Sequence, residues 1–150
     1  MKKCIKRISV AILILCLTIV PFSPVSATVA DGNEIITPYY NNVKSASTVI
    51  SINNSGKLTI TYSYSGSPSI TTKAIITTYI EKKTLGLFWT RVDIGTTNDE
   101  WVDTINSSSY SGTRTYQLSS TGTYRVTTVY KIYGSGGAAD EIECRAQDSY

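Results

Sequence analysis

The side chains best suited to acid–base or metal chemistry are carboxylates, which gather in two short stretches of the chain. Paired carboxylates can hydrolyse glycosidic bonds or bind Ca²⁺ through hard oxygen ligands. Neither stretch has the ligand spacing of a calcium loop, and alternate acidic residues of a strand project to one solvent-facing side. We therefore expect charged, solvated sheet edges and no metal or catalytic site. The two stretches are Asp99, Glu100 and Asp103, and Asp140, Glu141 and Glu143.

The remaining residues give little support to nucleophilic catalysis. The 150-residue chain has no histidine, which excludes triads, dyads and metal sites that depend on imidazole. Cys144 alternates in phase with Ile142 and Ala146, so we expect a small buried hydrophobic side chain there, or else an intermolecular disulfide. Residues 134–139 match the dinucleotide pattern G-x-G-x-x-A, but a strand-like alternation follows them, which favours a hairpin loop. Neither an enzymatic activity nor a cofactor is expected.

A set of aromatic and basic residues is predicted to share one outer face of a sheet. This follows if the even-numbered residues of 76–80, and Phe88, Val92 and Ile94, face the core, because their neighbours then face solvent. Aromatic and arginine side chains dominate binding hot spots, and aromatic faces also stack on sugar rings. The reverse register, or a cover from the loop at 98–101, would remove the patch. The predicted patch consists of Tyr79, Trp89, Arg91, Lys131 and Tyr133.

The first 27 residues have the organisation of a secretory signal peptide. Four basic residues within 2–7 precede a 13-residue apolar run at 8–20, shorter than the ~20 residues of a membrane-spanning helix. Residues 25–27 predict cleavage after Ala27. Cleavage removes four of the 14 basic residues and leaves 10 against 11 acidic ones, which argues against nucleic-acid binding. We expect an extracellular protein without a transmembrane segment after processing, released or held non-covalently at the cell envelope.

The elements that must position these residues are strands. Residues 28–46 are polar without a sustained period and are predicted to be a loose N-terminal leader. From residue 47 to 150 the hydrophobicity alternates with a period of two, and turn residues interrupt it at regular intervals, including a loop predicted at 107–112. These features predict one all-β domain, a single antiparallel β-sandwich of about seven or eight strands.

One motif carries a resemblance to a known architecture. Leu118-x-x-x-Gly122-x-Tyr124-x-Val126 resembles the E–F corner of immunoglobulin-like β-sandwiches, where a tyrosine hydroxyl bonds back to the backbone of the turn. The resemblance implies an immunoglobulin-like sandwich with Gly122 and Tyr124 in a structural tyrosine corner. Val126 stands where antibody-type domains have a cysteine, so the inter-sheet disulfide is absent. The overall layout also resembles small uncharacterised exported proteins of Gram-positive bacteria, which implies secretion and a β fold but no activity.

The expected function is a secreted, non-enzymatic interaction module for an unknown extracellular protein or glycan, and we expect a monomer or weak self-association. Two alternatives come from other classes. The Ser/Thr-rich alternation at 47–78 resembles the pore-forming hairpins of β-barrel toxins, which would make the protein membrane-active. Exposed edge strands would instead suit a passive structural component that self-associates.

Overall fold

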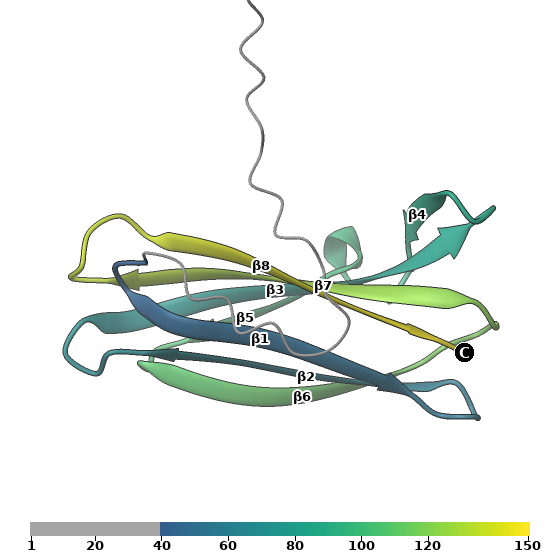
Figure 1. The fold of residues 1–150 in the computed structure, drawn as a ribbon, viewed down its shortest axis with the longest axis horizontal. Coiled ribbons are helices and arrows are strands. Elements are labelled where there is room, and N and C mark those ends of the chain that lie inside the picture. The colour runs from purple at the N-terminus through teal and green to yellow at the C-terminus, as the bar shows by residue number, and fades with distance from the viewer. Residues whose placement is uncertain (1–39) are drawn as a thin grey trace, which may run out of the picture.

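The computed structural model describes residues 40–150, which form eight β-strands in two antiparallel sheets (Figure 1). In this part of the chain the only helical element is a short 3₁₀ turn at Thr97–Asp99, so the prediction of an all-β antiparallel fold is confirmed. The predicted signal peptide, its cleavage after Ala27 and most of the predicted leader at 28–46 lie outside the described residues. The strands are β1 (Val43–Ile52), β2 (Lys57–Gly66), β3 (Thr71–Thr84), β4 (Phe88–Arg91), β5 (Trp101–Ile105), β6 (Ser109–Gln117), β7 (Thr123–Gly134) and β8 (Asp140–Ser149).

The two sheets have three and five strands. The three-stranded sheet has the order β1-β2-β6, and the five-stranded sheet has the order β4-β3-β7-β8 with β5 also paired to β3. Because β3 is 14 residues long, one of its edges holds two short strands, β5 along its first half and β4 along its last four residues. The other edge of β3 pairs with β7. The hairpin of β3 and β4 therefore stands out from the body of the sandwich (Figure 1).

Alternate residues of the long strands fill the space between the sheets. The ring of Tyr130 is fully buried, and its hydroxyl donates to the backbone carbonyl of Ser47 in the opposite sheet (2.6 Å). Burial raises the pKa of this phenol. Each large side chain that is fully buried stabilises the fold by about 1.5–3 kcal/mol. The most deeply buried apolar residues are Leu58, Ile60, Ala74, Ile76, Ile80, Val126, Tyr130 and Ile132.

On one open side of the sandwich, two carboxylates of β8 accept hydrogen bonds from backbone N–H groups along the edge of β1. The side chain of Asp140 accepts hydrogen bonds from the backbone N–H groups of Asn42 (2.6 Å) and Val43 (3.1 Å). At the other end of β8, Asp148 accepts one from the N–H of Ile52 (2.8 Å). These bonds replace the strand pairing that the edge of β1 lacks and satisfy backbone donors that would otherwise be unpaired.

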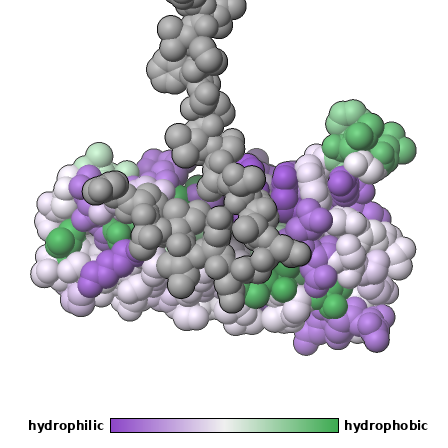
Figure 2. Space-filling model, viewed as in Figure 1, coloured by the Kyte–Doolittle hydropathy of each residue, from purple (hydrophilic) through white to green (hydrophobic). Residues whose placement is uncertain are grey.

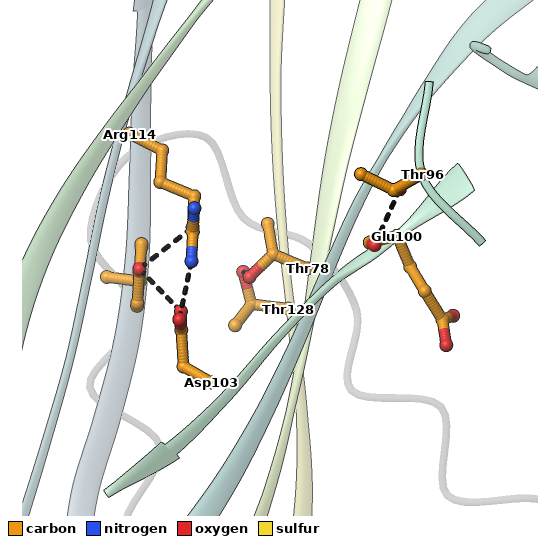
Figure 3. A network of polar contacts seen from close by, with 7 residues as sticks. Thr78, Thr96, Glu100, Asp103, Arg114 and Thr128 are labelled. Carbon is orange, nitrogen blue, oxygen red and sulfur yellow. Dashed lines mark hydrogen bonds and ion pairs between the residues drawn. The ribbon is translucent and has the colours of Figure 1, made fainter. Parts of the chain in front are cut away.

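On the opposite side, an ion pair joins β5 to β6. Arg114 and Asp103 approach to 2.5 Å, with side chains 31% and 22% exposed (Figure 3). The hydroxyl of Tyr62, from the adjacent strand β2, donates to the same carboxylate (2.8 Å). Burial, together with this hydrogen bond to Asp103, raises the pKa of Tyr62 to about 12. The two sheets are thus tied together by polar contacts as well as by the core.

Two strand boundaries differ from the predicted ones. β1 begins at Val43, so residues 43–46 belong to the sandwich and not to a loose leader; Val43 and Ala46 are 5% and 2% exposed. β6 begins at Ser109, inside the predicted loop at 107–112. Serine and glycine have low strand propensity, but pairing with β2 overrides this preference. Glycine is required at 112, because a Cβ there would lie 2.7 Å from the ring of Tyr110.

The turn between β6 and β7 contains the predicted corner motif. The hydroxyl of Tyr124 donates to the backbone carbonyl of Ser120, four residues earlier (2.6 Å), which is the hydrogen bond that a tyrosine corner makes. Tyr124 is 2% exposed, and Val126 follows it in the core. The bond fixes the entry of β7, the strand that supplies part of the outer face described next.

Candidate functional site

The predicted outer-face residues come from three adjacent strands of the five-stranded sheet. Tyr79 lies on β3, Trp89 and Arg91 lie on β4, and Lys131 and Tyr133 lie on β7. Arg91 and Lys131 are exposed, and the three aromatic residues are half-buried. Their neighbours along β3 and β7 are mostly buried in the core. All five therefore share the face that points away from the three-stranded sheet.

At the β4 end of this face, cations lie against aromatic rings. The guanidinium carbon of Arg91 is 3.4 Å from the centroid of the Tyr79 ring. The ring of Trp89 has the guanidinium of Arg125 at 4.3 Å and the ammonium of Lys83 at 5.8 Å from its centroid. Such contacts are favourable within about 6 Å of a ring centroid. We call Tyr79, Glu81, Lys83, Trp89, Arg91 and Arg125 the cation–aromatic cluster.

Two carboxylates partly neutralise the cluster. Glu81 is paired in register with Arg91 on β4 and with Arg125 on β7, and its carboxylate forms an ion pair with Arg125 (2.7 Å). This pair is largely buried, with side chains 13% and 21% exposed. Arg91 lies 3.5 Å from Glu100, and this pair is more open. Lys83 is exposed and forms no ion pair with any residue of 40–150, so it carries the unpaired positive charge of the cluster.

The other predicted residues form a separate pair further along β7. The ammonium of Lys73 lies 5.6 Å from the centroid of the Tyr133 ring, next to Lys131. Thr127 is opposite Tyr79 in the β3–β7 register. Lys131 and Tyr133 are four and six residues beyond Thr127, about 13 and 20 Å along an extended strand. The five predicted residues therefore lie on one face but in two groups.

The β3–β4 hairpin ends in an exposed apolar tip, which the alternation of the sequence does not indicate. Leu85, Leu87 and Phe88 are 84%, 76% and 63% exposed. Figure 2 shows them as a green cap on the projecting hairpin, over a surface that is mostly white and purple. The prediction that Phe88 faces the core is wrong, because β4 pairs only with the projecting end of β3, where no opposite sheet covers it. We call Leu85, Gly86, Leu87 and Phe88 the hairpin tip.

The residues considered for catalysis or metal binding make contacts that stabilise the fold. Asp103 pairs with Arg114, and Asp140 accepts backbone hydrogen bonds. Cys144 is free and 8% exposed, and burial, followed by the charge of Glu143, raises the pKa of its thiol to about 11. Within residues 40–150, no three side chains of the metal-binding types come close enough to hold an ion. A thiol with a raised pKa is a poor nucleophile.

Comparisons give no family to which the chain can be assigned. No protein-family model and no curated protein matches it. Over residues 40–150, none of the helical structure is long and apolar enough to cross a membrane. The two surface features, the cation–aromatic cluster and the hairpin tip, are therefore the basis for inferring what the protein does.

Proposed function

We propose that this protein is an exported, non-enzymatic interaction module that binds a partner at the cell envelope through the cation–aromatic cluster. The cluster carries the proposal, because it combines arginine, tryptophan and tyrosine, the residue types enriched in binding hot spots, on a rigid sheet. An immunoglobulin-like architecture accords with the strand order and with the corner at Tyr124. Such sandwiches serve many functions, so the proposal rests on the cluster and not on the fold.

The geometry of the cluster favours a carboxylate-bearing protein surface over a neutral glycan. Sugar rings stack on free aromatic faces, but Arg91 already lies on Tyr79 and Arg125 on Trp89. The rings hold the guanidinium groups in fixed orientations, which lowers the entropy cost of binding a partner. Guanidinium N–H groups recognise carboxylates through paired hydrogen bonds, and Arg91 is the one exposed for this role, since Arg125 is paired with Glu81. Lys83, without an ion-pair partner in the described chain, adds long-range attraction for an acidic surface.

The experiment is co-sedimentation of the purified protein with isolated cell envelopes, with and without prior protease treatment of the envelopes. Arg91→Ala and Trp89→Ala are the test variants, and Lys131→Ala is the matched control, since it removes a cation from the same face but from the separate group. We expect saturable binding that both test variants weaken at least about tenfold, with Lys131→Ala unchanged and each melting temperature measured alongside.

The outcomes separate the alternatives. Binding that protease treatment removes would identify a protein partner. Binding that survives protease treatment but is lost in the test variants would keep the cluster as the site and replace the protein partner with a glycan or lipid component of the envelope. If the wild-type protein does not sediment, or if Lys131→Ala weakens binding as much as Arg91→Ala does, the proposed site is wrong.

Self-association is a second candidate function, and the free edge of β6 favours it. The carbonyl of Ser108 accepts from the N–H of Gly66 at the end of β2, and the N–H of Leu118 donates to the carbonyl of Gly56 just before β2. In this register the backbone groups of the even-numbered residues of β6 point to β2, so those of the odd-numbered residues point to the free edge. This edge is nine residues long and has no bulge, and its one charged residue, Arg114, is paired with Asp103 of the other sheet, whereas β8 presents several exposed charges. Charges and bulges are what protect edge strands. Concentration-dependent dimers in sedimentation velocity, abolished by Thr113→Lys, would support this function; a monomer at all concentrations would exclude it.

A further inference from the structure

Leu85 has a backbone conformation that leucine rarely adopts. Its φ is 52°, and Gly86 follows with φ 70°, in a turn closed by a hydrogen bond from the N–H of Leu87 to the carbonyl of Thr84 (3.1 Å). Two successive positive φ angles are typical of hairpin turns in which asparagine followed by glycine is preferred. A leucine at the first of these positions is strained by its positive φ. It contributes nothing to the core, because its side chain is 84% exposed. A residue that violates both local preference and burial indicates a function at that place.

The hairpin tip is also a projecting apolar surface and not an isolated exposed side chain. Leu85, Leu87 and Phe88 are consecutive apart from one glycine, and all three are more than half exposed. They stand at the end of a hairpin that extends beyond the sandwich (Figures 1 and 2). A contiguous exposed apolar surface marks a contact with another protein or with a membrane.

The charges around the tip favour a membrane over another protein as the contact surface. The hairpin segment 81–91 contains three cations and one acidic residue, Glu81, whose charge is paired with Arg125. Lys83 is exposed beside Trp89, and Arg91 is exposed on the second strand, 3.5 Å from Glu100. Lys82 lies on the same hairpin, and its ammonium group donates a hydrogen bond to the hydroxyl of Ser120 (2.7 Å). Basic residues directly behind an apolar surface are complementary to anionic lipid headgroups, and tryptophan prefers this interface.

We propose that the hairpin tip inserts into the interfacial region of an anionic lipid bilayer, with Leu85, Leu87 and Phe88 among the upper acyl chains and Lys83 at the headgroups. A convex tip without hydrogen-bonding side chains fits a fluid bilayer, which adapts to it, whereas a protein partner would need a preformed apolar pocket. The insertion is peripheral, since three side chains are far shorter than a membrane span. It goes beyond the proposed function and depends on the apolar tip, and Lys83 is the one residue that the two proposals share.

The test uses purified protein and protein-free vesicles of phosphatidylcholine, with or without phosphatidylserine, in a sedimentation assay. Leu87→Ser/Phe88→Ser is the test variant, and Val49→Ser/Val102→Ser is the matched control, because these valines are exposed apolar residues elsewhere (48% and 54%). We expect the wild type to bind the anionic vesicles, the tip variant to bind roughly a hundredfold more weakly, and the control to bind like the wild type. Lys83→Gln should weaken binding to anionic vesicles about fivefold and have no effect on neutral ones.

Each other outcome overturns the inference. It is wrong if the wild type does not bind anionic vesicles, if the tip variant binds as well as the wild type, or if the valine control loses as much binding as the tip variant. Tip-dependent binding to cell envelopes without any binding to vesicles would assign the tip to a protein partner. Because the vesicles contain neither protein nor glycan, failure here leaves the envelope-binding result for Arg91→Ala unaffected.

Discussion

Replacing Leu85 by asparagine is expected to stabilise the domain while weakening membrane docking. The left-handed conformation at φ 52° costs an L-residue about 1–2 kcal/mol, and asparagine relieves part of this cost through its short polar side chain. Since Leu85 is 84% exposed, almost no burial is lost on folding. The free energy of unfolding should therefore rise by about 1 kcal/mol, which corresponds to roughly 4–8 °C in melting temperature for a domain of about 100 residues.

The neighbouring position supplies a control of opposite sign. Gly86 has φ 70°, and a Cβ added there would meet nothing within 4 Å, so Gly86→Ala introduces backbone strain without a steric clash. We expect it to lower the free energy of unfolding by about 1 kcal/mol. Urea unfolding measures both variants, and vesicle sedimentation of Leu85→Asn should show weaker binding by about tenfold. A destabilised Leu85→Asn, or a neutral Gly86→Ala, would refute the claim that this turn is strained.

Three further predictions concern the body of the sandwich. Asp103→Ala should lower the free energy of unfolding by about 2–3 kcal/mol, because it leaves Arg114 and the Tyr62 hydroxyl without their partner; Glu143→Ala, from a pair that is about 40% exposed, should cost at most about 0.5 kcal/mol in the same urea titration. The pKa of Tyr62 is raised from 10.0 to about 12, so stability should be full below pH 10 and fall as the pH rises towards 12, and this fall should be smaller in Tyr62→Phe. Cys144 should react with a thiol reagent at pH 8 far more slowly in the native protein than in urea, and equal rates would contradict its burial.

The alternation of the sequence was sufficient to predict the fold class but not its boundaries. The period of two in β2, β3 and β7 follows directly from burial of every second side chain, so these strands were predictable. The first residues of β1 were not, because they pair with the end of β2 across an irregularity between Val43 and Ser45, and because the N–H of Val43 is bound by Asp140, almost 100 residues away. Neither contact leaves a periodic signal in a polar segment. Long-range pairing likewise makes a strand of Ser109–Gln117, which has weak local preference.

The candidate site was predictable where it depends on alternation within a strand. Tyr79 faces outward because its neighbours Thr78 and Ile80 on β3 are buried. Trp89 and Arg91 share that face because they pair with odd-numbered residues of β3. Arg125 has the same odd-numbered phase as Lys131, so its place on this face could have been inferred from the sequence. The separation into two groups depends on the register between β3 and β7, which no local pattern determines. The inward placement of Phe88 failed because alternation gives the side of a strand but not whether another sheet lies opposite.

The cation–aromatic cluster and the hairpin tip are physically connected. A hairpin that projects beyond the sandwich has no core beneath it, and isolated two-stranded hairpins are marginally stable. Here the base of the hairpin is fixed by Arg125 of β7, which contacts both Glu81 on β3 and Trp89 on β4. Side-chain contacts across three strands thus supply the stability that a second sheet gives elsewhere. This support explains how the domain tolerates a strained leucine at an exposed turn, and it means that Trp89 contributes to the position of the tip as well as to the outer face.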